Sequence, residues 1–516
     1  MPAFRMVWAA VLITNIGGWM ASVATAWLMT SLDPSPLMVS LVSAATSLPL
    51  FLFALPAGAL ADIVDRRKLL ILAQFFMLAL AIVLLLLTIA GLITPWSLLI
   101  LIFLIETGTA FETPAFLAVL PGLVPSPQLQ PALALNGVGI NISRIVGPAL
   151  GGLVVSAIGV VSAFAINAVT FAAVIFAYAR LPPTRPETCL PAERFLTAIR
   201  TGLRFTRESA ELKATLVRSA AFFLFASAYL ALLPLIARNQ LAAGASGFGI
   251  LFACHGAGAV LGALVLPYAR GRTTSDQLVL GGGLVAAAMT AMLAVIQHIA
   301  LAIPIVLITG AGSLALMSTL MLSAQVALPS WVKARGLAVV QMVLSGAISV
   351  GSLIWGALAD RAGIPATLIV AAGGLAVASI LTRGWRLPAQ AASDDRPSLH
   401  WPAPVVVGTI PDDRGPVMVT INYRIDPARA EAFAEVLERM GQIRRRDGAL
   451  FWEHFADTAD PGQHVEVFIA ENWLDHLRQH ERITRADRAL EEELSSYQVD
   501  NKAPVVTHLV SARSRS

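Results

Sequence analysis

Apolar runs recur from residue 6 to residue 383, each long enough to cross a membrane as a single helix. A helix of about 20 apolar residues spans the ~30 Å hydrocarbon core of a bilayer. Only 13% of the residues are charged and 57% are hydrophobic, against about 25% and 45–50% in soluble globular chains. The runs therefore predict an all-α membrane domain, and composition excludes a large soluble protein.

Twelve such segments can be counted. Their expected bounds are 6–30, 37–61, 69–91, 95–119, 132–157, 160–180, 214–236, 246–268, 277–297, 300–325, 335–358 and 364–383. The first run is too long for the apolar core of a signal peptide, so we expect it to be a retained helix.

Basic residues are distributed unequally between the two sides that this count defines. One side carries 18 Lys and Arg residues: Arg5, Arg66, Arg67, Lys68, Arg180, Arg185, Arg194, Arg200, Arg204, Arg207, Lys213, Arg218, Arg270, Arg272, Lys333, Arg335, Arg383 and Arg386. The other side carries Arg238 and Arg361. The positive-inside rule makes the basic side cytoplasmic. We expect a multi-pass protein of the inner, cytoplasmic membrane with both termini in the cytoplasm.

A constant offset of 204 residues relates motifs in the first part of the membrane domain to similar motifs in the second part. GAL at 58–60 recurs at 262–264, and Arg66 falls on Arg270. The same offset pairs further residues: Gly108 with Gly312, Pro125 with Pro329, Gly147 with Gly351, Gly152 with Gly356, and Gly159 with Gly363. We expect two six-helix halves, 1–180 and 214–383, joined by a cytoplasmic linker at 181–213. Secondary transporters built this way bind their substrate between the halves.

The segment GALADIVDRRK at 58–68 resembles the loop signature G-x-x-x-D-(R/K)-x-G-(R/K)-(R/K) of the major facilitator superfamily. Four positions match the signature: Gly58, Asp62, Arg66 and Arg67. Ile63 and Asp65 depart from it. The resemblance implies a conformational gate in which Asp62 docks on the opposite half and favours the outward-facing state. The simpler alternative is a turn that only sets the topology.

A second signature, G-P-x-x-G-G, is typical of exporters in that superfamily and falls in the fifth expected helix. Its residues are Gly147, Pro148, Gly151 and Gly152. With TPW at 94–96, WGALADRAG at 355–363 and the tail segment RGPVMVTINYRIDP, the chain resembles the transmembrane secretion effectors, the subgroup of the enterobactin exporter. The resemblance implies the major facilitator fold and export of a small molecule. It also implies that a proton gradient is the energy source, without a bound cofactor. Siderophores, macrolides and other drugs remain open as substrates.

Ionisable residues at the centre of a bilayer cost about 2.5–3.5 kcal/mol each and usually mark pathways or pairs. Helix 4 is expected to hold Glu106 and Glu112, and helix 5 Arg144, whose depth lies between them. A pair between Arg144 and either carboxylate is geometrically possible, as a proton-linked gate or as a static lock. Other candidates for the proton or substrate pathway are His255, Asn136 and Asn141.

After a linker at 384–414, the pattern of the chain changes to alternating strands and amphipathic helices. The order β-α-β-β-α-β over residues 415–516 predicts a small ferredoxin-like α+β domain. It resembles antibiotic-biosynthesis-monooxygenase-like domains, which commonly pair their sheets, so dimerisation through the tail is possible.

The tail also carries His476 and His480, spaced to share one face of a helix. With Trp473 and His454 they suggest a ligand or haem site, but a solvated or interface face is the preferred interpretation, and no metal site is expected. The leading hypothesis is therefore a transporter, not an enzyme. The alternative is a membrane-tethered monooxygenase-like enzyme or a sensor in which the tail carries the activity. We find no sequence signature of nucleic-acid binding.

Overall fold

The computed structural model describes residues 2–181, 204–329, 331–388, 398, 401, 404, 406, 408–499 and 504–512. The chain forms two compact units. The first, Met1–Phe195 with Ala214–Ser323 and Leu337–Leu387, is a helical bundle. The second comprises Leu196–Lys213, Ala324–Gly336 and Pro388–Ser516, and it contains a four-stranded sheet.

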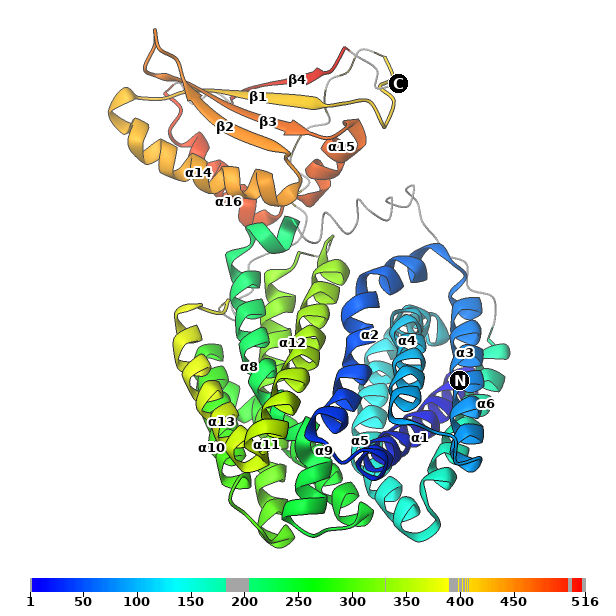
Figure 1. The fold of residues 1–516 in the computed structure, drawn as a ribbon. Helices are drawn as coiled ribbons and strands as arrows, with labels where there is room; N and C mark the ends of the chain where they lie inside the picture. The colour runs from blue at the N-terminus through cyan, green and yellow to red at the C-terminus, as the bar shows by residue number, and fades with distance from the viewer. Residues whose placement is uncertain are drawn as a thin grey trace. The chain divides into compact units, whose positions relative to one another are not determined.

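Twelve helices in the described part of the chain are long and apolar enough to cross a membrane, which confirms the predicted number. They are α1 (Pro2–Leu32), α2 (Pro36–Ile63), α3 (Arg66–Ile89), α4 (Pro95–Val119), α5 (Leu129–Ile158), α6 (Val160–Ala179), α8 (Ala210–Leu235), α9 (Ala245–Arg270), α10 (Ser275–Leu293), α11 (Ile299–Ala327), α12 (Lys333–Ala362) and α13 (Ile364–Leu381). In Figure 1 the helices α1–α6 lie beside α8–α13.

Local sequence signals begin several of these helices. Ser35 caps α2 just before Pro36, and Asp65 caps α3 through the Lys68 amide. Thr94 and Ser97 form a capping box at the start of α4. Each cap satisfies amide groups that the first helical turn leaves without a partner.

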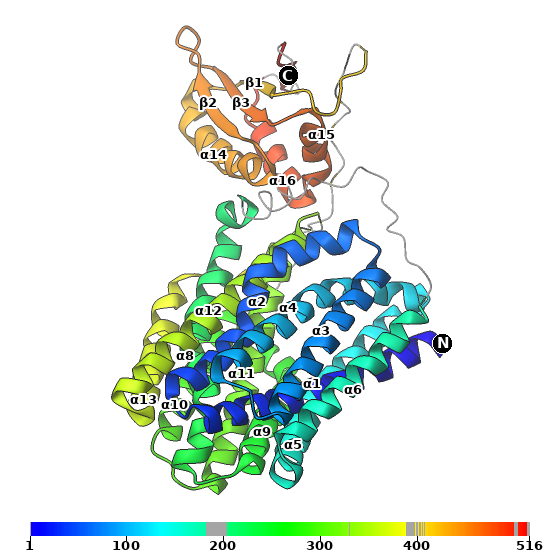
Figure 2. The same cartoon turned by 45° about the vertical axis from the view of Figure 1, so that its right-hand side comes forward.

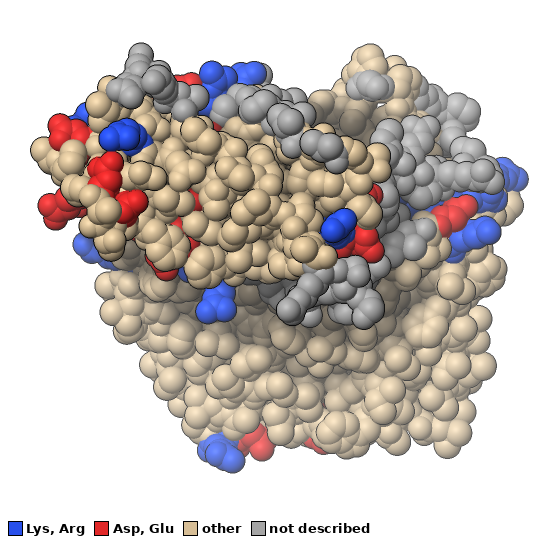
Figure 3. Space-filling model, turned by 90° about the horizontal axis from the view of Figure 1, so that it is seen from above, with Lys and Arg blue, Asp and Glu red and all other residues tan. Residues whose placement is uncertain are grey.

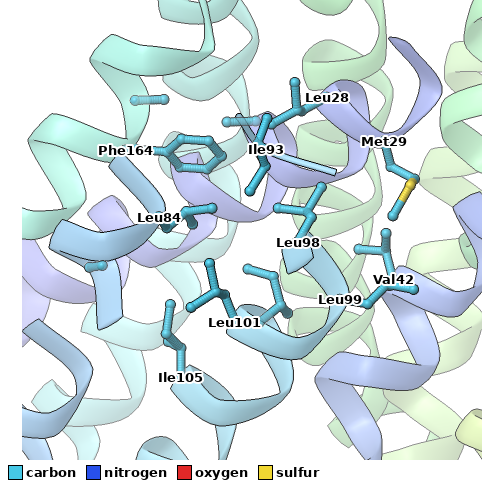
Figure 4. Packing of buried hydrophobic residues seen from close by; sticks show 14 of the residues in the cluster. Leu28, Met29, Val42, Leu84, Ile93, Leu98, Leu99, Leu101, Ile105 and Phe164 are labelled. Carbon is cyan, nitrogen blue, oxygen red and sulfur yellow. The ribbon is translucent and has the colours of Figure 1, made fainter. Parts of the chain in front are cut away.

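Buried leucine and aromatic side chains pack the interior of the first six helices. Figure 4 shows Leu84, Leu98, Leu101 and Phe164 from this cluster, each less than 10% exposed. Large apolar side chains also point outward, as with Leu264, which is 72% exposed. Residues other than Lys, Arg, Asp and Glu make up most of the surface in Figure 3. Outward-facing apolar side chains on the membrane helices, such as Leu264, suit the apolar interior of a bilayer.

The two halves contact each other along α2 and α12. Ser47 Oγ lies 2.8 Å from Ser349 Oγ, and Ser352 Oγ donates to Ser43 Oγ at 3.2 Å. We call the end of the bundle that carries residues 64–68 the motif end. Since α2 starts at Pro36 and reaches the motif end at Ile63, these contacts join the halves in the part of α2 nearer the opposite end.

The tail contains an antiparallel sheet in the order β2-β3-β1-β4. Its elements are β1 (Val417–Arg424), α14 (Ala430–Asp447), β2 (Phe451–Ala456), β3 (Gln463–Ala470), α15 (Trp473–Arg482), α16 (Arg485–Ser495) and β4 (Val505–Val510). The three helices lie on one face of the sheet (Figures 1 and 2). The observed order of elements confirms the predicted ferredoxin-like arrangement.

The other face of this sheet, which we call the open face, carries exposed apolar side chains. Phe451 and Leu509 are 44% and 47% exposed, and Phe455 and Val505 are 49% and 66% exposed. Strand pairing aligns Phe451 with Ile469, and Leu509 with Met418. One apolar row, Phe451, Ile469, Met418 and Leu509, therefore crosses the open face, and a second row, Phe455, Val465 and Val505, is interrupted by Asn422.

Candidate functional site

A cluster of charged and aromatic side chains lies where the two halves cross, and we call it the central cluster. It consists of Trp19 on α1, Arg144 on α5, Tyr229 on α8, and Phe252 and His255 on α9. The guanidinium of Arg144 lies 5.9 Å from the centre of the Trp19 ring. His255 Nδ1 is 2.6 Å from the Tyr229 hydroxyl, and Trp19 meets Phe252 edge to face at 5.6 Å.

The structure brings together two residues that the sequence marked separately. Arg144 is close enough to His255 to act on it electrostatically. A Cβ atom at Gly256 would lie 2.4 Å from the Arg144 carbonyl oxygen, so only glycine lets α9 approach α5 here. The cluster combines a fixed positive charge, a side chain that can carry a proton and three aromatic rings. These groups can bind an organic molecule through both charge and ring contacts.

The helix-5 motif forms the crossing itself. A Cβ at Gly147 would lie 2.5 Å from Trp19 Cβ, and one at Gly151 would lie 2.9 Å from Met20 Cα, both on α1. A Cβ at Gly152 would lie 2.8 Å from Gly249 Cα on α9. The motif therefore places α5 in backbone contact with α1 in its own half and with α9 in the other half.

Glu112 is held within the N-terminal half, away from the central cluster. Its Oε1 accepts hydrogen bonds from Gln74 Nε2 at 2.7 Å and from the Tyr178 hydroxyl at 2.9 Å. The pair considered with Arg144 is not formed in this conformation. Glu112 points toward α3 and α6, whereas Arg144 points toward α1 and α9.

Glu106 lies six residues before Glu112 on α4; the hydroxyl of Thr109, the next polar residue but one, is directed to Met77 Sδ and the Ile105 carbonyl, both at 3.5 Å. Among the interactions described for Glu106 and Arg144, there is no pair between them. Asn141 donates to the Gly137 carbonyl of its own helix at 3.0 Å, and Asn136 is half-buried. The structure therefore does not bring these three candidates into the central cluster through the contacts described.

Two arginines of segment 58–68 donate hydrogen bonds to the ends of neighbouring helices. Arg66 Nη1 donates to the Ala118 carbonyl of α4 at 3.3 Å, and Arg67 donates to the Ala179 carbonyl at the end of α6. Cations are favourable at these carbonyl-rich ends. A Cβ at Gly58 would meet no atom within 4 Å. The side chain of Asp62 lies outside the described residues, so its docking remains a prediction.

Sequence reasoning did not select Trp19, Gln74, Tyr178, Tyr229 or Phe252. A buried Gln or Tyr within an apolar helix is the signal that was available, because such side chains need a partner. In the tail, His454 Nε2 lies 2.7 Å from His464 Nδ1, so His454 belongs to a separate pair from that of His476 and His480.

Twelve apolar helices in two halves, with charged and aromatic residues where the halves cross, define a membrane transporter of the major facilitator type. Solved structures of this fold are similar. A POT family transporter in complex with a thioalcohol-conjugated peptide has a TM-score of 0.61 at 14% identity, covering 73% of this chain and 94% of that chain. A bacterial homologue of the human lysosomal transporter Spinster, inward-facing and unoccupied, has a TM-score of 0.54 at 14% identity, covering 75% and 95%.

Two curated relatives are efflux proteins. Macrolide efflux protein A of Streptococcus pyogenes is 26% identical over 265 residues, which are 51% of this chain and 65% of that protein. Multidrug efflux pump Tap of Mycobacterium tuberculosis is 28% identical over 221 residues, which are 40% of this chain and 50% of that protein. The matched part of the chain thus spans one half to about two thirds of the length of these relatives. All of residues 1–516 match the family described as transmembrane secretion effector, and the chain belongs to that family.

Proposed function

We propose that this protein is a proton-coupled exporter of a small molecule, siderophore or drug-like, across the cytoplasmic membrane. The similarity to macrolide and multidrug efflux proteins supports the direction of transport. The excess of Lys and Arg on one side supports cytoplasmic termini. Within the family, the sequence signatures favour the subgroup of the enterobactin exporter.

The observation that carries this proposal is the central cluster. Transporters of this kind bind substrate near the bilayer midplane, between the two repeats. Here that region has a cation at Arg144, a titratable imidazole at His255 and the rings of Trp19, Tyr229 and Phe252. An organic molecule with an aromatic part and a negative or polar group matches this set. A proton on His255 would repel Arg144, so proton and substrate binding can affect each other.

Glu112 is the second element of the proposed proton coupling. Its carboxyl group accepts two hydrogen bonds from neutral donors, and these bonds link α4 to α3 and α6. Both bonds end on Oε1, so a proton taken up by Oε2 leaves them in place but makes their acceptor uncharged, and hydrogen bonds to a neutral acceptor are weaker than those to a carboxylate. A change of protonation therefore changes how the three helices are held together.

The test is uptake into inside-out vesicles, which corresponds to export from the cell, measured with labelled siderophores and macrolides with and without a proton gradient. We expect Glu112→Gln to lower gradient-driven transport by about 10–150-fold, the equivalent of a charged hydrogen bond of ~1.5–3 kcal/mol. The exposed Glu435→Gln is the matched control. Transport that is unchanged by Glu112→Gln over a range of pH would remove Glu112 from the mechanism. Absence of substrate counterflow in the unsubstituted protein would favour a sensor.

For the tail we propose a dimerising role, in keeping with its resemblance to antibiotic-biosynthesis-monooxygenase-like domains. The exposed apolar side chains of the open face would pack against those of a second copy. We expect the double substitution Phe451→Glu and Leu509→Glu to convert a dimer of the full chain to a monomer in mass photometry. Val499→Glu adds a charge at an equally exposed residue outside the sheet and should leave the dimer intact. A monomeric unsubstituted protein would contradict the proposal.

A further inference from the structure

Histidines gather in the tail. The chain has eight, and six of them lie between residues 400 and 508. Three meet in space: His476 and His480, one turn apart on α15, and His508 on β4. His508 pairs across the sheet with Val419, whose side chain is buried in the core, so His508 lies on the face that the helices cover. We call these three residues the histidine cluster.

The spacing of the cluster suits a tetrahedral metal ion. One nitrogen from each ring can be chosen so that all three lie within 4.8 Å of one another. His476 Nε2 and His480 Nε2 are 3.3 Å apart. Zinc–nitrogen bonds of 2.0–2.1 Å place tetrahedral ligands about 3.3 Å apart. Two ligands already have that separation, and a small rotation of His508 would bring in the third.

Groups around the cluster fit the same role. The side chain of His476 is completely buried, and its Nδ1 has no hydrogen-bond partner among the described residues. The Oε1 atom of Gln479, three residues further along α15, is also buried and has no hydrogen-bond partner among the described residues. A metal-bound histidine usually donates its second N–H to an oxygen. Donation from Nδ1 to Gln479 would satisfy both atoms and leave Nε2 free for a metal.

The surroundings of the three rings also favour the charge state that binds a metal. Burial, with the nearby His480 and His508, lowers the pKa of His476 to about 3. Burial, with His508 and Arg444, lowers the pKa of His480 to about 4. Burial thus favours the neutral imidazole, which is the form that binds a metal.

The neighbouring cation does not oppose a metal strongly, because it is already neutralised. Arg444 Nε lies 3.1 Å from Glu466 Oε1, and Arg444 Nη1 lies 3.2 Å from Glu491 Oε1. Two carboxylates thus balance the one guanidinium. Arg444 also lies over the Trp401 ring, which in turn meets His480 edge to face at 4.8 Å.

We propose that His476, His480 and His508 form a binding site for a divalent transition-metal ion, with Zn²⁺ the best match. Three imidazoles suit zinc, copper or nickel, and the tetrahedral spacing favours zinc. A water molecule would take the fourth position. Because β4 is an edge strand, the ion would fasten it to α15 and so stabilise the end of the tail domain.

The test uses the full-length chain, purified in detergent without a polyhistidine tag and stripped with a chelator. Zn²⁺ is then titrated at pH 7 against a chromophoric competitor, and Co²⁺ is added separately to record visible absorption bands. We expect one ion per chain, tetrahedral Co²⁺ bands and a higher melting temperature with Zn²⁺. His508→Ala and His480→Gln should each weaken binding by at least the ~10–100-fold lost when an outer partner is removed.

Two matched variants serve as controls. His454→Ala removes a histidine of the same domain that lies in the other pair, and His298→Ala removes an exposed histidine from the membrane unit. Both should bind Zn²⁺ like the unsubstituted chain. The proposal fails if the unsubstituted chain binds no stoichiometric Zn²⁺, if His508→Ala and His480→Gln both bind normally, or if only His454→Ala loses binding. Using His480→Gln alongside His508→Ala keeps the test valid should one variant not fold.

Discussion

Glu466 is a fully buried carboxylate that accepts three hydrogen bonds in the tail. The donors are the Tyr423 hydroxyl at 2.9 Å, Arg444 Nε at 3.1 Å and Trp452 Nε1 at 3.0 Å. Removing one partner of a buried ion pair costs about 3–5 kcal/mol. Because Arg444 keeps Glu491, we expect Glu466→Gln to lower the free energy of unfolding of the tail by about 3 kcal/mol, measured by denaturant unfolding of the full chain.

The control for Glu466 is an exposed ion pair in the same domain. Glu493 Oε2 lies 3.0 Å from Arg439 Nη2, with both side chains about half exposed. Exposed pairs contribute about 0–1 kcal/mol. Glu493→Gln should therefore lower stability by less than ~1 kcal/mol. Equal losses from the two variants would show that the buried network does not hold the tail together.

Tyr229 allows a test of the imidazole at the centre of the bundle. Tyr229→Phe removes the hydroxyl that contacts His255 Nδ1 and keeps the ring. We expect the pH at which efflux is half-maximal to shift, because a neutral hydrogen bond of ~0.5–1.5 kcal/mol affects the two protonation states of His255 unequally. Tyr268→Phe, at an exposed ring of α9, is the control. If the pH dependence of efflux is the same in Tyr229→Phe and Tyr268→Phe, His255 has no role in proton coupling.

At the scale of single residues, the sequence could identify unusual residue types in the helices but not their partners. Arg144 and His255 could be selected because ionisable side chains are rare in apolar helices. Their proximity could not be predicted, since it depends on which helices cross and on Gly256 at the crossing. For the same reason, Glu112 could be identified but not its donors Gln74 and Tyr178, which lie on two other helices.

At the scale of elements, the packing of α5 against its neighbouring helices depends on its glycines, which leave room for close backbone contact. Gly152→Leu would force a side chain into the backbone of α9, where a Cβ would already lie 2.8 Å from the Ala245 carbonyl oxygen. Overpacking of this kind costs about 1–3 kcal/mol. We expect the conformation with α5 and α9 in contact to lose population by about 5–150-fold, seen as increased thiol labelling of cysteines placed at this crossing.

Gly137→Leu is the control within the same helix, since a Cβ at Gly137 meets no atom within 4 Å. It should leave labelling and efflux close to those of the unsubstituted protein. If Gly152→Leu behaves like Gly137→Leu, the helix-5 motif does not hold the halves together.

Helices and strands were the most predictable part of this protein. Apolar length and alternation are local properties, so the twelve spans and the order of elements in the tail follow from them. The histidine cluster could not be predicted, because it depends on contacts between residues far apart in the sequence. His508 lies 28 positions after His480, on a strand, so sequence spacing does not relate them. Only the packing of α15 over the sheet brings them together.

At the scale of the whole molecule, transport requires the contacts between the halves to form and break. Ser47 and Ser349 face each other across α2 and α12 with their Oγ atoms 2.8 Å apart. Cysteines at these positions would be within reach of a disulfide, whose Cβ atoms are typically about 3.5–4.5 Å apart. In a background with Cys189→Ser and Cys254→Ser, we expect oxidation of the Ser47→Cys, Ser349→Cys variant to stop efflux.

Reduction should restore transport in that variant, because the bond blocks only the separation of the halves. Each single cysteine, oxidised in the same way, should transport normally, which separates cross-linking from damage to α2 or α12. The bond would trap the conformation in which the halves are joined along this stretch of α2. Normal efflux from a fully cross-linked double variant would mean that the halves stay together there throughout the cycle. Substrate would then have to cross by a movement other than alternating access between the two halves.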